Sequence, residues 1–157
     1  MIIIIVGPDG SGKSTLAKQI SEQTGYAIEH RSKPKNQAEK DVMMNMYRDV
    51  AVSSDNIILD RAWYCEMVYG DIMRDASCIS MDQMYELEEL IANNKGGLII
   101  HCTDDTGKLW DRCMDRGEDY IQDISTLSLI KNMYDWLMHY IPHKIPVVRY
   151  EINENMS

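Results

Sequence analysis

The chain has 157 residues, the usual size of one domain, and 45% of them are hydrophobic, which is enough to form a packed core. Its 25 acidic and 16 basic residues give a formal net charge of −9, which argues against binding of long nucleic acid, because such binding needs a basic surface. No apolar run approaches the roughly 18 residues of a membrane span, and the apolar start lacks the basic residues of a signal peptide, so we expect a cytoplasmic protein.

Short apolar runs alternate with amphipathic segments along the chain. The first run, Met1–Val6, is rich in β-branched isoleucine and ends at Gly7-Pro8, which is typical of a strand buried on both faces. Ser80, with Gln83 three residues later, forms a capping-box pattern at a helix start. The expected strands are 1–6, 26–30, 56–60, 98–102 and 147–152, and the expected helices are 14–24, 37–53, 62–73, 81–93, 108–116 and 125–140. This alternation predicts one α/β domain over residues 1–157, with three α/β/α layers and a five-stranded, mostly parallel sheet.

The sulfur-containing residues point to a reduced, flexible core. The chain has 12 methionines and no phenylalanine, so we expect thioether side chains to fill much of the interior. Its four cysteines form no C-x-x-C pair and have no zinc-ligand spacing. They are Cys65, Cys78, Cys102 and Cys113. We therefore expect free thiols, as is usual in the cytosol.

Residues 7–14 read G-P-D-G-S-G-K-S, a complete G-x-x-x-x-G-K-[ST] motif, and Thr15 follows. Glycines in this pattern let the backbone turn tightly, so that amide groups and the helix N-terminus face phosphate oxygens. Lys13 is expected to reach the β- and γ-phosphates, and the Ser14 hydroxyl to bind Mg²⁺. Because the motif follows an expected strand and opens an expected helix, it predicts an ATP-binding site. The site comprises Gly7, Asp9, Gly10, Ser11, Gly12, Lys13, Ser14 and Thr15.

Two strand ends offer an aspartate for the metal. One strand ends in Asp60, which Arg61 follows directly, and another leads into Asp104-Asp105. The guanine-specific N-K-x-D tetrad is absent from the sequence. An acidic residue joined to an arginine suits a site that holds both a metal ion and a second phosphate. This combination favours a kinase that acts on a phosphorylated small molecule.

Three segments resemble the thymidylate kinases. The loop motif carries an acidic residue two positions after its first glycine, as theirs does, and residues 60–70, D-R-A-W-Y-C-E-M-V-Y-G, resemble their second signature. Residues 108–121 look like their arginine-bearing lid, which we expect around residues 106–122. The chain departs from the family at Ala62 and Cys65, where an aromatic residue and serine are typical, and this leaves the base identity open. The resemblance implies a P-loop kinase fold, ATP and Mg²⁺, a deoxynucleoside monophosphate such as dTMP as acceptor, and a homodimer.

The resemblance also implies roles for the acceptor side of the site. Asp9 would contact the sugar 3′-hydroxyl of the acceptor, which favours a deoxynucleotide, and Arg61 would hold the acceptor phosphate. Asp60 would organise that phosphate and the waters of the metal, so that Ser14 and Asp60 are the implied metal ligands. Tyr69 would pack near the sugar or the base.

Further arginines are candidates by position. Some relatives carry an arginine directly after the loop acid, where this chain has Gly10, so the cation that stabilises the transition state is expected from the lid, as Arg112 and Arg116. Arg48 matches the position of a base-reading arginine. Arg31 lies in a basic loop, where it either contacts phosphate or only adds solubility.

Several alternatives remain open at this point. A phosphate acceptor needs no strong general base, because Lys13, Mg²⁺ and arginines can position it and neutralise its charge. A kinase of a deoxynucleoside or DNA hydroxyl would need a base, for which Glu29 is the candidate. A third hypothesis is a regulator that binds nucleotide without turnover. Asp60-Arg61 could also be a surface ion pair, and Arg112 and Arg116 a solvated helix face.

Overall fold

The computed structural model describes residues 1–30, 37–73, 79–117 and 123–152. Its five strands form one sheet in the order β2-β3-β1-β4-β5, and every neighbouring pair is parallel. The strands are β1 (Ile2–Val6), β2 (Ala27–His30), β3 (Ile57–Asp60), β4 (Gly97–Thr103) and β5 (Val147–Glu151). The five-stranded parallel sheet predicted from the sequence is therefore confirmed, as are the approximate bounds of each strand.

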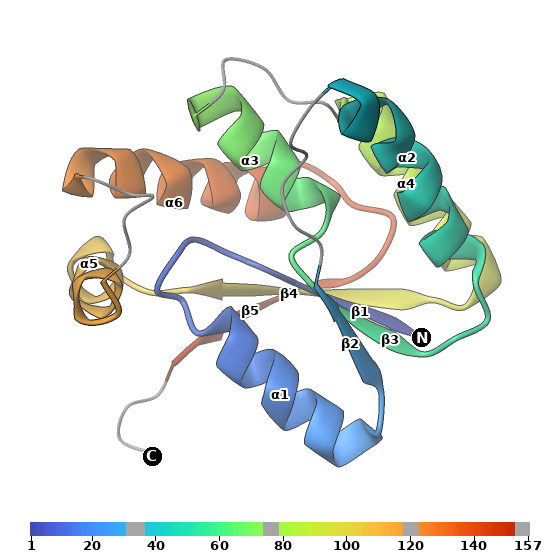
Figure 1. Cartoon of the computed structure of the whole chain (residues 1–157), viewed down its shortest axis with the longest axis horizontal. Coiled ribbons are helices and arrows are strands. Elements are labelled where there is room, and N and C mark those ends of the chain that lie inside the picture. The colour runs from blue at the N-terminus through green and yellow to red at the C-terminus, as the bar shows by residue number, and fades with distance from the viewer. Residues whose placement is uncertain (31–36, 74–78, 118–122, 153–157) are drawn as a thin grey trace.

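Helices cover both faces of this sheet (Figure 1). They are α1 (Lys13–Thr24), α2 (Gln37–Val52), α3 (Trp63–Met73), α4 (Met81–Asn94), α5 (Thr106–Asp115) and α6 (Ile124–His139). Of the described helices, α1 lies on one face, α2, α3, α4 and α6 lie on the other, and α5 lies beyond the carboxyl end of β4 (Figure 1). This arrangement confirms the expected three layers. No helix in the described part of the chain is long and apolar enough to cross a membrane.

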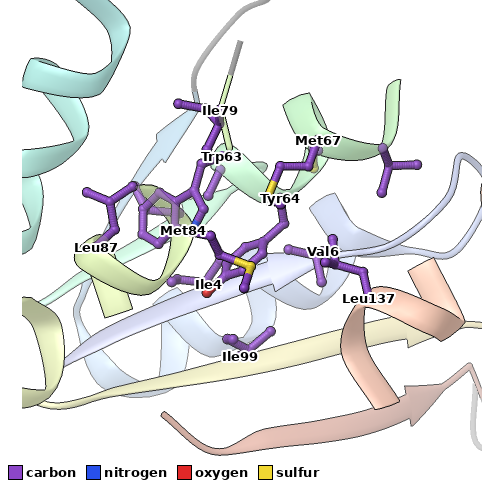
Figure 2. Packing of buried hydrophobic residues seen from close by; sticks show 14 of the residues in the cluster. Ile4, Val6, Trp63, Tyr64, Met67, Ile79, Met84, Leu87, Ile99 and Leu137 are labelled. Atoms are coloured by element: carbon purple, nitrogen blue, oxygen red, sulfur yellow. The ribbon is translucent and has the colours of Figure 1, made fainter. Parts of the chain in front are cut away.

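The core follows from the alternation of side chains along β1. Ile2, Ile4 and Val6 pack into the larger cluster under the four helices, whereas Ile3 and Ile5 pack against α1. Each fully buried isoleucine contributes about 2 kcal/mol. Figure 2 shows the larger cluster, in which Trp63 and Tyr64 of α3 lie beside Met84 and Leu87 of α4. The methionines buried in this cluster, as the composition predicted, are Met43, Met44, Met67, Met84 and Met138.

Helix starts are where the sequence expectations need correction. The capping box is confirmed, with Ser80 and Gln83 bonded reciprocally. Helix α5, expected from Lys108, begins at Thr106 because the Asp105 side chain accepts from the Lys108 amide at 3.0 Å. Helix α6, expected from residue 125, begins at Ile124 because Asp123 accepts from the Thr126 amide. In both cases an aspartate outside the expected helix is the cap.

The parallel strands place their carboxyl ends at one edge of the sheet. The glycine-rich loop follows β1, Arg61 follows β3, and Asp104 follows β4. Ligands of open α/β sheets bind at this edge.

The free thiols expected from the sequence are present at Cys65, Cys102 and Cys113, which are all buried. Cys78 lies outside the described residues.

Candidate functional site

The glycine-rich loop fits tightly between neighbouring elements. Gly10 adopts a left-handed backbone with φ 82°, and a Cβ atom there would lie 2.6 Å from the carbonyl oxygen of Leu109 in α5. Gly7 has no room either, because a Cβ would collide with the carbonyl oxygen of Cys102 in β4. A side chain at either position would push the loop off its neighbours. The backbone is thus held in the turn from which its amides can face an anion.

The side chains of Lys13 and Ser11 donate hydrogen bonds to backbone carbonyls of the same loop. The Lys13 ammonium is buried and donates to the carbonyl oxygens of Gly7 at 2.7 Å and Pro8 at 3.0 Å. The Ser11 hydroxyl donates to the same Pro8 carbonyl at 2.6 Å. A buried ammonium that bonds to neutral carbonyls can exchange them for the charged oxygens of an incoming phosphate, which bind it more strongly.

Two strand ends can now be distinguished as metal sites. The Ser14 hydroxyl donates to the carboxylate of Asp60 at 3.0 Å, and Asp60 is buried at the end of β3. A hydroxyl and a carboxylate are oxygen ligands of the kind that Mg²⁺ prefers, with waters and phosphates as the remaining ligands. Asp104 instead pairs with Arg112 at 2.7 Å. The donor set at Ser14 and Asp60 therefore fits Mg²⁺ better than the one at Asp104.

Arg61 adopts a backbone conformation that is unusual for a residue with a side chain. It is a non-glycine residue with φ 72°, a left-handed conformation that costs about 1–2 kcal/mol. Its amide donates to the carbonyl of Ile5 at 3.3 Å, which ties the turn after β3 to β1. Its guanidinium lies 3.8 Å from the carboxylate of Asp9 and is 40% exposed. Burial disfavours the charged guanidinium, but negative groups including Asp9 raise its pKa overall, so the cation is held at the mouth of the site.

Asp9 is the buried acid of the loop. Its carboxylate accepts from the Tyr69 hydroxyl of α3 at 3.0 Å and is only 6% exposed. Burial and the charge of Asp9 raise the pKa of Tyr69 well above its ordinary value, so the phenol remains a donor. Asp9, Asp60, Arg61 and Tyr69, which we call the Asp9 cluster, thus lie together although they come from three segments of the chain.

The lid arginines occupy different places. Arg112 donates to the Gly10 carbonyl at 3.1 Å and to the Asp104 carboxylate, so it joins α5 to the loop. Burial alone would raise the pKa of Asp104, but the bonds from Arg112 and the Asp105 amide hold it below its ordinary value. Arg116 is exposed at the end of α5, and residues 118–122 of the expected lid lie outside the described residues.

Three other candidates are not brought to this cluster. Arg48 pairs with Glu86 at 2.7 Å, on the part of the helical layer where α2 and α4 lie together, away from α5 (Figure 1). Glu29 pairs in register with Leu59, next to Asp60, but it lines a pocket of about 250 Å³ that also includes Asp49 of α2 and Ile57 at the start of β3. Arg31 lies outside the described residues.

Two residues that the sequence analysis did not assign a role adjoin the Asp9 cluster. Cys65 is buried, and burial raises the pKa of its thiol. The nearby positive charges of Lys13 and Arg61 oppose this effect by lowering the pKa. Tyr134 of α6 packs edge-on against Tyr69, with ring centroids 6.2 Å apart. The sequence could have indicated that Cys65 lies near the site, because Cys65 belongs to residues 60–70. Nothing in the spacing of Tyr134 indicated that it lies there too.

Comparisons with known proteins find relatives of the chain in sequence and in fold. No protein-family model matches the chain. The chain is 27% identical over 130 residues to the SPbeta prophage-derived protein YorR of Bacillus subtilis, covering 83% of this chain and 78% of YorR. It is 28% identical over 145 residues to an adenylate kinase of Kocuria rhizophila, covering 85% of this chain and 77% of that enzyme.

Solved structures show the same fold. The crystal structure of Bacillus subtilis YorR in complex with phosphorylated GDP matches with a TM-score of 0.80 and 22% identity, covering 96% of this chain and 85% of YorR. Deoxyadenosine kinase from M. mycoides, with the products dCMP and dCDP bound, matches with a TM-score of 0.68 and 18% identity, covering 99% and 93% of the two chains. The fold is that of the P-loop kinases, and the similarities support a nucleotide phosphotransferase.

Proposed function

We propose that the chain is a deoxynucleoside monophosphate kinase that transfers the γ-phosphoryl group of ATP to an acceptor such as dTMP. The observation that carries this proposal is the position of Arg61. Its guanidinium lies beside Asp9 of the phosphate-binding loop, and the preceding residue, Asp60, binds the Ser14 hydroxyl. A cation for a second phosphate therefore lies next to the oxygen ligands of the proposed metal site. Similarity to an adenylate kinase and to deoxyadenosine kinase supports the same class of reaction.

The donor half of the reaction uses the loop. Its amides and Lys13 would bind the ATP phosphates, with Lys13 exchanging the Gly7 and Pro8 carbonyls for phosphate oxygens. Ser14 and Asp60 would hold Mg²⁺, which supplies charge neutralisation at the phosphates. The loop geometry is already formed, so little ordering is needed when ATP binds.

The acceptor half uses the Asp9 cluster. Arg61 would bind the acceptor phosphate, and Asp9 would accept a hydrogen bond from the sugar 3′-hydroxyl in place of Tyr69. The acceptor phosphate oxygen attacks the γ-phosphorus, and the bond from that phosphorus to the β,γ-bridging oxygen breaks, giving ADP and a deoxynucleoside diphosphate. Arg112 holds the loop at Gly10, and Arg116 is the proposed cation of the closed lid.

A second candidate is a deoxynucleoside kinase, because deoxyadenosine kinase shares the fold over nearly the whole chain. That reaction needs a general base to deprotonate a hydroxyl. Glu29, the base suggested by the sequence, lies instead in the pocket beside α2. A hydroxyl kinase that used Glu29 as its base would lose activity on exchange of Glu29 for glutamine, whereas a monophosphate kinase would scarcely be affected.

The test is an ATP-consumption assay against nucleosides, deoxynucleoside monophosphates and DNA. For the preferred monophosphate, Arg61→Ala should raise the acceptor KM about 30-fold or more through loss of a charge-assisted contact, and the KM for ATP less than about twofold. Lys144→Ala, which removes a surface cation paired with Glu89, is the control and should change neither value. An equal effect of Arg61→Ala on both substrates, or turnover only with DNA, would contradict the proposal.

A further inference from the structure

Helix α5 packs directly on the phosphate-binding loop at Gly10. A Cβ atom at Gly10 would lie 2.6 Å from the Leu109 carbonyl oxygen and 3.2 Å from the Cys113 sulfur. Arg112 of the same helix donates to the Gly10 carbonyl oxygen at 3.1 Å. Positions 109, 112 and 113 share one face of a helix, so a single face of α5 fixes the position of Gly10.

The bond from Arg112 also orients the peptide between Gly10 and Ser11. In a trans peptide the carbonyl and the following amide point in opposite directions, so a carbonyl directed toward α5 leaves the Ser11 amide directed into the loop. There the amide lies 3.3 Å from the Pro8 carbonyl oxygen, which the Lys13 ammonium and the Ser11 hydroxyl also bond. Because glycine permits more than one orientation of this peptide, contacts from outside Gly10 must select it.

Asp104 holds the Arg112 guanidinium in place. One carboxylate oxygen of Asp104 accepts from Arg112 at 2.7 Å, and the other accepts from the Asp105 amide at 2.8 Å. Asp104 is buried and directly follows β4, so it is anchored to the sheet. The two ends of the Arg112 fork therefore bridge Asp104 and the loop, which the single ammonium of a lysine does not reproduce.

We propose that Asp104 is a positioning residue for ATP: it orients Arg112 so that the Ser11 amide faces the bound phosphates. This role rests on the proposed function for the donor alone, since it needs ATP on the loop but no particular acceptor. When phosphate oxygens replace the Pro8 carbonyl as the acceptor, the amide and the Lys13 ammonium already converge on one point. Simple electrostatics assigns Asp104 the opposite effect, because a carboxylate close to the loop repels an anion.

Isothermal titration calorimetry of the whole chain with ATP and Mg²⁺ measures this role. Asp104→Asn should weaken ATP binding about fivefold to 30-fold, because the neutral amide loses the charge-assisted bond that holds Arg112. Inorganic tripolyphosphate, which has no base or sugar, should lose affinity by the same factor. Asp111→Asn is the matched control, because Asp111 is an exposed acid of α5 next to Arg112 and loses the same charge. It should leave both affinities within about twofold of the unaltered chain.

Arg112→Lys is the second variant, and it carries the test alone if circular dichroism shows that Asp104→Asn does not fold. It keeps the positive charge but loses the bridge, so it should weaken ATP binding by a similar factor and leave kcat at saturating ATP within about twofold. Because Asp104 acts through Arg112, the double variant should bind ATP no more than about twofold more weakly than Arg112→Lys alone.

Unchanged or tighter ATP binding in Asp104→Asn would overturn the inference, as would a loss that Asp111→Asn shares. A lower kcat with unchanged ATP binding in Arg112→Lys would also overturn it, because Arg112 would then act on the transferring phosphoryl group. Lack of turnover with every monophosphate would contradict the proposed function instead, and the binding measurements would still decide the role of Asp104.

Discussion

Helix α3 carries two tyrosines that each donate a hydrogen bond to a buried carboxylate, but the two clusters are built differently. Tyr64 donates to Glu88 at 2.7 Å, and Tyr69 donates to Asp9 at 3.0 Å. Each carboxylate also meets a basic side chain, His143 for Glu88 and Arg61 for Asp9. We call Tyr64, Glu88, His143 and Lys144 the Glu88 cluster.

The Glu88 cluster is closed. Glu88 is fully buried and accepts three bonds of 2.7 Å, from Tyr64, from the His143 ring and from the Lys144 amide. The other ring nitrogen of His143 lies 2.7 Å from the Leu137 carbonyl oxygen, so it must donate to it. These bonds join α3 and α4 to the segment between α6 and β5. The protein itself supplies these three short hydrogen bonds to Glu88, so the cluster has no weak contact to exchange for one with a ligand.

The Asp9 cluster is open. Its ion pair is 3.8 Å long, its arginine is 40% exposed, and that arginine has a left-handed backbone. Longer contacts and an exposed cation can be exchanged for those of a phosphate at little cost. The difference between the two clusters indicates that burial and charge alone do not mark a site; a long ion pair, an exposed cation and backbone strain do.

The largest expected effect comes from neutralising each carboxylate. Glu88→Gln should lower the free energy of unfolding by about 3 kcal/mol, because it removes the buried partner of His143, and leave kcat/KM unchanged in the folded protein. Asp9→Asn should lower kcat/KM for the acceptor about 10- to 100-fold with less than about 1 kcal/mol change in stability. Urea unfolding and steady-state kinetics measure both. If Asp9→Asn destabilises the chain as much as Glu88→Gln does, the contrast between the clusters is wrong.

A smaller effect is expected from removing one hydroxyl at a time. Tyr64→Phe leaves Glu88 with one bond fewer and should cost about 1–2 kcal/mol of stability. Tyr69→Phe should cost less than that and change the acceptor KM about threefold to tenfold, since the acceptor replaces this bond. Thermal unfolding and acceptor titrations distinguish the pair. Equal loss of stability, with no change in KM for Tyr69→Phe, would place Tyr69 among the purely structural residues.

The parts of the molecule that could be predicted from sequence are those encoded by contiguous residues. The loop from Gly7 to Thr15 is one segment whose glycines and Lys13 specify its turn, and the apolar runs specify the strands. Ser14 and Asp60, which the resemblance implies as metal ligands, lie within hydrogen-bond distance of each other, because parallel strands bring their carboxyl ends to one edge.

Contacts between distant segments could not be predicted. The position of Arg48 was inferred from a resemblance, but which helix face it occupies depends on α4, where Glu86 binds it. Arg112 was expected as a catalytic cation, and nothing in its spacing indicated the bond to the Gly10 carbonyl. Nothing in the sequence joins Glu88 to His143, because their meeting depends on how α4 packs against the chain after α6. The roles of the site residues therefore remain predictions that the variants test.

The smallest expected effect is a pH dependence confined to the Glu88 cluster. Burial opposes the charged ring of His143, but the bonds to Glu88 and Leu137 raise its pKa above the ordinary 6.5. Because the folded-state pKa is the higher one, this stabilisation is complete below about pH 6.5 and is lost as the pH rises through the raised value. Tyr64 stays protonated over this range, since burial and Glu88 raise its pKa well above 10.

Urea unfolding between about pH 6 and 9 measures the loss, which we expect to be about 1 kcal/mol. His101 overlaps only the acid end of this range and acts in the opposite direction: burial and His139 lower its pKa to about 4, so stability falls as the pH drops below the unfolded value of about 6.5. In Glu88→Gln the neutral amide no longer favours the charged ring, and the decline above pH 6.5 should largely disappear. A decline of the same size in Glu88→Gln would mean that the alkaline dependence arises elsewhere, and that the Glu88 cluster is held by its neutral hydrogen bonds rather than by an ion pair.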